Sequence, residues 1–211
     1  MEIQFLTNKQ INREKWDVCI ANADCPLPYV LSWYLDASTG NQWHALVAGD
    51  YCYVMPLPYN KKIPFFPQVY QPILSQQLGI FGRTVSTELM ERFIQSIPSK
   101  FSLTNIPFNH CNPDLTTRDH RFALRTNLIL DLNRPYNEIK NNYAHGLRQR
   151  LKKAAGKLKI SETDDTWAFQ KFCMEIMGNK LPYNSKQTKH LKQLLTAIKA
   201  QKAGRIYRII D

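Results

Sequence analysis

One stretch, residues 133–160, constrains the second half of this chain most, because it combines a helical repeat with one-sided charge. Its apolar residues recur at every fourth position, a spacing that stacks side chains on one face of a helix: Ile139, Tyr143, Leu147, Leu151 and Ala155. We expect Asn133 to cap this helix and Pro135 to lie in its first turn, where a missing N–H costs nothing. The pattern predicts one amphipathic helix whose apolar face packs on a core.

The same stretch is cationic. Residues 141–160 contain no acidic residue and six basic ones: Arg148, Arg150, Lys152, Lys153, Lys157 and Lys159. Arg148 and Lys152 lie one turn apart on one helix face, an arrangement suited to a phosphate-bearing ligand. A solvated, lysine-rich surface helix is the alternative interpretation, and we weigh the two equally.

Charge is distributed unevenly along the 211 residues, whose formal net charge is +11. Residues 1–130 carry 11 basic and 10 acidic side chains, whereas residues 131–211 carry 17 basic and 7 acidic ones. This asymmetry favours an acidic partner for the second part: a nucleic acid, a nucleotide or a membrane surface. No apolar run approaches the ~20 residues that span a bilayer, and the N-terminus lacks the apolar core of a signal peptide. We expect a cytoplasmic protein.

The five cysteines are widely spaced and form no C-x-x-C pair, a usage typical of reduced thiols in a reducing compartment. A zinc site could be drawn from four residues, Cys19, Cys25, His110 and Cys111, but their spacing matches no metal module. The sequence therefore predicts no metal site. It also lacks the G-x-S-x-G, G-x-x-x-x-G-K-[ST], G-x-G-x-x-G and H-E-x-x-H signatures of common catalytic and nucleotide sites.

Helical and strand-like patterns alternate along the chain, which predicts a mixed α/β fold. The expected helices begin after Asn12, cover residues 32–37, begin after Ser86, cover residues 167–177 and begin after Ser185. The expected strands cover residues 43–48 and 51–57, joined by a Gly49-Asp50 hairpin turn, and residues 101–107, 126–132 and 205–211. The last strand either opens an incomplete second sheet or extends the edge of the first.

Several of these segments resemble a known family. They are SWYLDAST, VMPLPYNKK, QPILSQQLGIFG, TNLILDLN and YAHGLRQRLKKA, which together span nearly the whole chain. In this order they resemble FemAB-like acyltransferases of the GNAT N-acetyltransferase superfamily. The resemblance implies two GNAT-like units in tandem with the substrate cleft between them. It also implies transfer of an acyl or aminoacyl group to an amine, in some members from aminoacyl-tRNA.

The implied fold class is α/β (α+β), with a mixed, mostly antiparallel sheet flanked by helices, then a C-terminal helical segment and a final strand. Residues 1–132 would form the first unit. Residues 133–211 would hold the basic connecting helix and the opening helices and first strand of a second, incomplete unit. Because the basic helix lies beside the acceptor cleft in this family, the implied substrate-binding residues are Tyr143, Arg148, Arg150 and Lys152, with Trp33, Tyr34, Tyr70 and Gln77 in the cleft wall.

The donor-binding loop of the superfamily reads R/Q-x-x-G-x-G/A, and its backbone amides bind the pyrophosphate of coenzyme A. The nearest match here runs from Gln76 through Gly79 to Phe81 and leads toward the helix after Ser86. Amides at such a junction can face a phosphate, although a plain turn is the favoured alternative. A phenylalanine at the last position obstructs close backbone approach. We therefore expect no acyl-CoA binding by this unit.

Three hypotheses follow. The first is a FemAB/GNAT-like N-acyltransferase that uses acyl-CoA or aminoacyl-tRNA as a donor substrate and holds no permanently bound cofactor. The second is a basic nucleic-acid-binding module without catalysis, and the third is an inactive GNAT-like scaffold. The expected partners are a phosphate-bearing small molecule or tRNA, and a second copy of the chain paired through the exposed C-terminal edge. The sequence assigns no general base.

Overall fold

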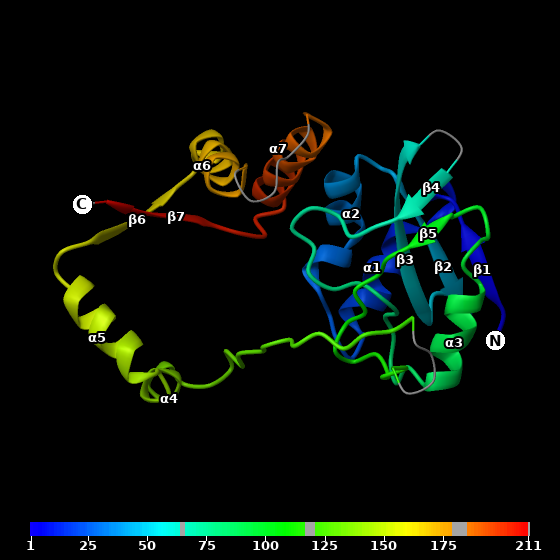
Figure 1. Cartoon of the computed structure of the whole chain (residues 1–211), viewed down its shortest axis with the longest axis horizontal. Helices are drawn as coiled ribbons and strands as arrows, with labels where there is room; N and C mark the ends of the chain where they lie inside the picture. Colours follow the sequence, from blue (N-terminus) through cyan, green and yellow to red (C-terminus); the bar gives the residue numbers. More distant parts are fainter. Residues whose placement is uncertain (64–65, 117–120, 179–184, 211) are drawn as a thin grey trace.

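A five-stranded sheet forms the centre of the N-terminal part (Figure 1). The computed structural model describes residues 1–63, 66–116, 121–178 and 185–210. The strands are β1 (Ile3–Leu6), β2 (Trp43–Ala48), β3 (Tyr53–Ile63), β4 (Phe66–Val69) and β5 (Leu103–Thr104), in that order across the sheet. Neighbouring strands are antiparallel except for the parallel pair β4–β5. With its flanking helices, this mixed and mostly antiparallel sheet confirms the predicted fold class.

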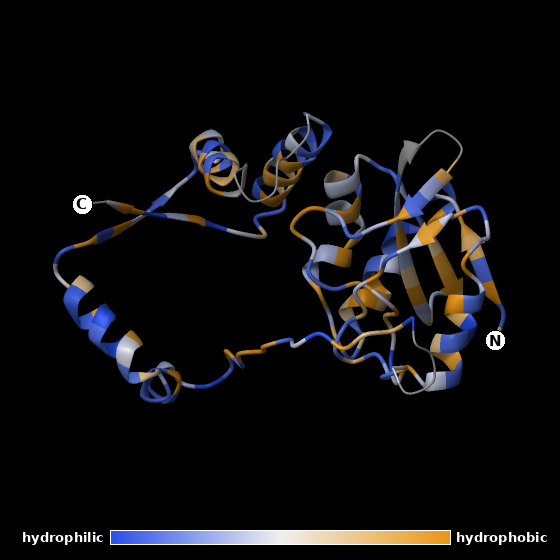
Figure 2. Cartoon of the chain, in the orientation of Figure 1, coloured by the Kyte–Doolittle hydropathy of each residue, from blue (hydrophilic) through white to orange (hydrophobic). Residues whose placement is uncertain are grey.

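Helices cover both faces of this sheet. They are α1 (Arg13–Ala21), α2 (Ser32–Thr39) and α3 (Thr87–Gln95), with short 3-10 turns η1 (Asn8–Gln10) and η2 (Pro28–Val30). The alternating residues of β2 divide between two cores: Ala45 and Val47 pack with Trp16 of α1, whereas Leu46 packs with Phe93 of α3. Because β2 is buried on both faces, its residues from Ala45 to Ala48 are all apolar, and the strand is mostly orange in the hydropathy colouring of Figure 2.

Side-chain caps mark the starts of α1 and α3 at the positions that the sequence predicted. The Asn12 side chain accepts a hydrogen bond from the Lys15 amide at 3.0 Å, and the Ser86 hydroxyl accepts one from the Leu89 amide at 3.2 Å. Each bond satisfies one of the otherwise unpaired amides of a helix N-terminus. The predicted hairpin is also confirmed, with β3 beginning two residues later than expected.

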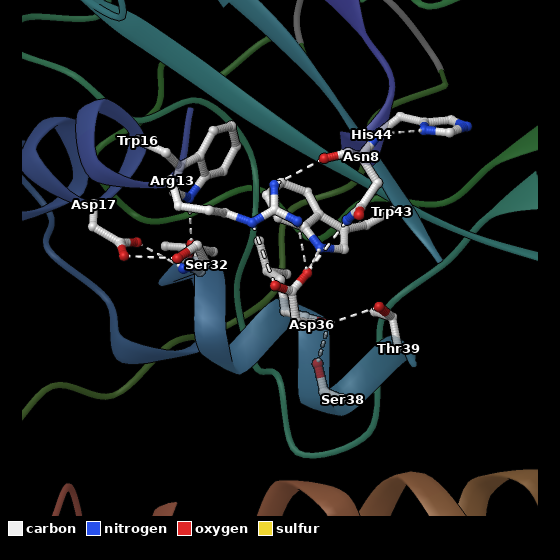
Figure 3. A network of polar contacts seen from close by, with 12 residues as sticks. Asn8, Arg13, Trp16, Asp17, Ser32, Asp36, Ser38, Thr39, Trp43 and His44 are labelled. Carbon is white, nitrogen blue, oxygen red and sulfur yellow. Dashed lines mark hydrogen bonds and ion pairs between the residues drawn. The ribbon is translucent and has the colours of Figure 1, made fainter. Parts of the chain in front are cut away.

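A polar network centred on Asp36 joins the first elements of the chain (Figure 3). Its carboxylate accepts from the buried Trp43 indole at 2.7 Å and from two nitrogens of Arg13 at 3.0 and 3.3 Å. The Arg13 guanidinium also lies over the Trp43 ring, 4.8 Å from its centroid, and donates to the Asn8 carbonyl at 3.0 Å. The network thus ties η1, α1 and β2 to α2.

The predicted helix over residues 133–160 is wrong as a single element. The structure has α4 (Tyr136–Asn141) and α5 (His145–Ala154), with Pro135 as the N-cap of α4 in place of Asn133. Neither helix contains a buried residue, so the predicted apolar face does not dock on a core. The two helices are separated by residues 142–144. Because helices in proteins are stabilised mainly by packing of an apolar face, this exposed stretch lacks the interaction that would favour one long helix.

The final strand does not extend the edge of the first sheet, which was one of the two arrangements expected for it. After α5 come β6 (Lys159–Thr163), α6 (Thr166–Gly178), α7 (Ser185–Ala200) and β7 (Ile206–Ile210). β7 pairs antiparallel with β6 in a separate two-stranded sheet, so it does not extend the edge of the first sheet. The predicted strand over residues 126–132 is extended but unpaired within the described part of the chain, and Leu128 is 90% exposed.

The C-terminal part contacts the N-terminal part through α7, which packs on α2 (Figure 1). Three leucines of α7 are buried: Leu191, Leu194 and Leu195. At the end of α2, Gly40 has φ +62°, and a Cβ there would lie 2.8 Å from Nε2 of the buried His190. This close approach requires glycine at position 40.

Away from α7, the C-terminal part buries little. No residue from 121 to 176 is buried, and the chain exposes 14198 Å². A compact monomer of its 24.6 kDa would expose roughly 10,000 Å². Much of the excess is apolar, including Leu128, Leu132 and Trp167. Within the described residues, no helix has both the length and the apolar character needed to cross a membrane.

The docking of α7 is expected to weaken in mild acid. Burial, followed by the charges of Lys186 and Lys189, lowers the pKa of His190 below its usual 6.5. The unfolded chain therefore binds this proton more readily, so His190 contributes stability above pH 6.5 that is lost as pH falls toward its folded pKa. Urea unfolding between about pH 7 and about pH 5 should show this loss, and His190→Gln should remove part of it. An equal pH dependence in His190→Gln would contradict the assignment.

Candidate functional site

Of the predicted cleft residues, the two aromatic neighbours on α2 are packed mainly as structural side chains. The Trp33 and Tyr34 rings meet edge to face at 5.5 Å, and the Tyr34 hydroxyl donates to the Leu74 carbonyl at 2.8 Å. Burial, with a smaller contribution from Tyr29, raises the pKa of Tyr34 to about 12. Burial also raises the pKa of Tyr70. Neither phenol is therefore suited to act as a base near neutral pH.

Three amides of the glycine-containing segment before α3 already donate within the protein. Residues 78–81 form a buried segment in which the Leu78 amide donates to the Pro107 carbonyl and the Phe81 amide to the Val54 carbonyl. The Ile80 amide donates to the Asn112 side chain at 2.9 Å. A phosphate cradle needs such amides unpaired and accessible. The plain-turn interpretation is therefore the better one, and the segment is part of the sheet packing.

Gln77, the fourth predicted wall residue, lies beside a group that the sequence did not assign. His110 Nδ1 is 3.3 Å from Gln77 Oε1 and 3.4 Å from Cys25 Sγ. Cys111 completes the group, because the ligand atoms of Cys25, His110 and Cys111 all lie within 4.8 Å of one another. Burial, reinforced by the neighbouring Cys111 thiol, raises the pKa of Cys25 to about 12.

Cys19, the fourth member of the set drawn from the sequence, lies apart from this group. Its buried thiol donates to the carbonyls of Cys52 and Phe81 at 3.7 and 3.8 Å. Burial, followed by the nearby Cys52, raises the pKa of Cys19 to about 11. Residue spacing alone could not separate Cys19 from the other three, because residues 25 and 110 meet only through the tertiary fold.

The basic residues predicted for the acceptor side lie on α5, which is exposed along its length. Arg148, Arg150 and Lys152 are all exposed, and no described carboxylate pairs with them. The Arg150 Nε donates to the Gly146 carbonyl one turn earlier. Tyr143 is half-buried in the connection between α4 and α5. We call these four residues together the α5 surface.

The structure does not bring the two predicted groups together. Figure 1 shows α5 separated from the five-stranded sheet by the extended segment before α4, while Trp33, Tyr34, Tyr70 and Gln77 belong to the N-terminal part. A single cleft lined by all eight residues is therefore not formed in this arrangement. A shallow surface hollow of about 640 Å³ lies elsewhere, lined by α1 and the β2–β3 turn and containing none of the eight.

Comparison with known proteins finds no match for this chain among family models, curated proteins or solved structures.

Proposed function

We propose that this chain is a FemAB-like acyltransferase that receives its aminoacyl donor as aminoacyl-tRNA, bound through the α5 surface. The observation that carries the proposal is the exposed, unpaired cationic face of α5, which has no acidic neighbour between residues 141 and 160. The mixed, mostly antiparallel sheet with flanking helices is the architecture that the family resemblance implies. Both features support an enzyme that binds a large anionic donor.

The α5 surface suits a polyanion better than a single phosphate. Arg148 and Lys152 stand one turn apart, and Arg150 lies between them in the sequence, so the cations point to more than one side of the helix. Such a distribution can contact successive phosphates along a backbone. Because each contact releases condensed counterions, the resulting affinity falls steeply with salt.

The buried segment before α3 helps to choose between the two donors. Coenzyme A would need free backbone amides for its pyrophosphate, and the amides of Leu78, Ile80 and Phe81 already donate within the protein. Aminoacyl-tRNA has no such requirement, because arginine and lysine side chains can bind its backbone. In the proposed reaction, the acceptor amine attacks the aminoacyl ester carbonyl. An amide bond forms, the ester bond to the tRNA ribose breaks, and the amine proton passes to the ribose hydroxyl.

Binding of bulk tRNA tests the first half of the proposal. We expect wild-type binding to weaken as salt rises, and the triple variant Arg148→Glu, Arg150→Glu, Lys152→Glu to bind at least about 10-fold more weakly, with a salt slope shallower by about 3. The matched control changes three exposed cations of the N-terminal part to glutamate: Lys9, Arg83 and Lys100. Equal losses in both triple variants would show that only overall charge matters.

Transfer tests the second half. The chain is incubated with aminoacyl-tRNA that carries a labelled amino acid and with a lysine-containing peptide as the acceptor amine. Label in the peptide, reduced by the α5 triple variant, is the expected result. Binding of tRNA without transfer would favour the second candidate, a nucleic-acid-binding module without catalysis, which the separation of the two residue groups also favours.

A further inference from the structure

Three side chains of the zinc-binding kind converge from segments 85 residues apart. Cys25 lies between α1 and η2, and His110 and Cys111 are neighbours in the turn after β5. The two sulfur atoms and the imidazole nitrogen lie within 4.8 Å of one another. Sulfur and nitrogen together are the donor set that zinc prefers in proteins, whereas magnesium and calcium prefer oxygen.

The spacing of these atoms fits a tetrahedral ion. With Zn–S near 2.3 Å and Zn–N near 2.0–2.1 Å, the sulfur and nitrogen of two ligands in a tetrahedral site lie about 3.6 Å apart. Cys25 Sγ lies 3.7 Å from His110 Nε2. The same sulfur lies 3.4 Å from Nδ1, so the imidazole has to turn before the Nε2 lone pair points at an ion held by Cys25.

The neighbour of His110 selects the nitrogen that would bind the ion. Nδ1 lies 3.3 Å from Gln77 Oε1, and because an amide oxygen can only accept, the tautomer protonated at Nδ1 satisfies this contact. Nε2 is then left with its lone pair free. Histidine ligands of metal ions are usually held in this way, with the second ring nitrogen donating to a neighbouring oxygen. Gln77 is 9% exposed, so it is a fixed partner.

The turn that carries His110 and Cys111 is rigidly attached to the core. Asn109 is buried and its side-chain amide donates to the Leu78 and Ile80 carbonyls at 3.1 Å, while its oxygen accepts from the Cys111 amide at 3.0 Å. Asn112 exchanges two hydrogen bonds with Ile80, at 2.8 and 2.9 Å. Such support keeps ligand positions preorganised, which is a requirement for tight metal binding.

We propose that Cys25, His110 and Cys111 form a zinc-binding site with its fourth coordination position open to water. Cys25 is buried, whereas His110 and Cys111 are exposed, so the ion has a path from solvent and a free side facing it. Three protein ligands and one open position are the arrangement found in catalytic rather than structural zinc sites. This site is independent of the α5 surface and of the proposed tRNA binding.

Zinc titration of the reduced full-length chain, after removal of metal by a chelator, tests the proposal. With a chromophoric competitor present, we expect one Zn²⁺ per chain, lost in Cys111→Ser and in His110→Ala. Gln77→Ala should bind about 10–100-fold more weakly, because it removes the partner that orients His110. The matched controls Cys52→Ser and Cys173→Ser remove thiols outside the site and should bind like the wild type.

Substitution of Co²⁺ for zinc supplies a readout of the ligands themselves. A thiolate-to-cobalt charge-transfer band is expected in the wild type and in both control variants, weakened in Cys111→Ser. Circular dichroism checks that Cys111→Ser, a change at an exposed position, keeps its fold. Zinc affinity equal in the wild type and in Cys111→Ser would overturn the proposal. Absence of zinc binding to the reduced wild type would also overturn it, and a Cys25–Cys111 disulfide found in the oxidised chain would then explain why the two thiols lie close together.

Discussion

Replacing Gly79 with alanine is expected to lower the free energy of unfolding by about 3–5 kcal/mol. Gly79 has φ +95°, a conformation that residues with a Cβ rarely adopt. A Cβ at this position would lie 2.3 Å from Asn112 Oδ1 and 2.8 Å from a ring carbon of Phe108. Backbone strain and steric overlap therefore act together.

The overlap cannot be relieved cheaply, because Asn112 is already engaged. Its side chain exchanges hydrogen bonds with Ile80, and moving it would leave the buried Ile80 amide without an acceptor. A buried amide without a partner costs about 1–3 kcal/mol. Urea unfolding followed by tryptophan fluorescence suits this measurement, because Trp16 and Trp43 are fully buried in the same part of the chain.

Gly146→Ala is the matched control, and it should raise the free energy of unfolding where Gly79→Ala lowers it. Gly146 lies in the first turn of α5, and a Cβ there meets nothing within 4 Å. Since alanine has the higher helix propensity, the change should stabilise α5 by up to about 1 kcal/mol. If Gly79→Ala unfolded at the same urea concentration as the wild type, residues 78–81 would not pack as described.

Sequence reasoning succeeded where the determining interactions are local. The helices after Asn12 and Ser86 each begin with a capping side chain that accepts a hydrogen bond from the amide three residues later. Each cap can be recognised from a few neighbouring residues of the sequence. The β2–β3 hairpin likewise depends on a short turn between two apolar runs. Such elements can be placed without knowing the rest of the fold.

Short strands and long-range contacts were missed for the opposite reason. β4, which contains a proline and follows a proline- and aromatic-rich segment, was not predicted, and β5 occupies only two residues of the strand predicted over 101–107. The parallel pairing of these two strands joins Gln68 to Leu103 and Val69 to Thr104, partners that lie far apart in the sequence. The prediction of one helix over 133–160 was wrong, because it assumed a core for the apolar face and neither α4 nor α5 buries a residue. The sequence pattern shows which face is apolar but does not show whether anything packs on it.

The candidate site divides in the same way. The cationic character of the α5 surface could be read from composition, because no fold is needed to know that residues 141–160 lack acidic side chains. The proximity of Cys25 and His110 could not be predicted from the sequence, since neither residue has a sequence neighbour that indicates the contact. Nor could the sequence show that Trp33 and Arg148 belong to separate surfaces, because that follows from the extended segment between the two parts.

Asp36→Ala is expected to lower the free energy of unfolding by about 2–4 kcal/mol, because it removes the carboxylate that accepts from both Trp43 and Arg13 in the network of Figure 3. The Trp43 residue is fully buried, and its indole N–H donates to Asp36 Oδ1 at 2.7 Å. Without that acceptor, the indole N–H is left unpaired in the core. Arg13 loses two hydrogen bonds, but its side chain is 32% exposed and can turn toward water, so its share of the loss is smaller.

Asp50→Ala tests whether burial or a short ion-pair distance determines how much stability a carboxylate contributes. Lys15 Nζ lies 2.6 Å from Asp50 Oδ1, closer than Arg13 lies to Asp36, yet the side chains of Lys15 and Asp50 are 48% and 76% exposed. Water and ions screen such a pair, so its removal should cost no more than about 1 kcal/mol. Asp36→Asn should fall between the two alanine variants, because the amide oxygen can still accept from Trp43 while the charge opposite Arg13 is lost. Urea midpoints of the three variants give the comparison, and a larger loss for Asp50→Ala than for Asp36→Ala would show that the Trp43 contact does not stabilise the fold.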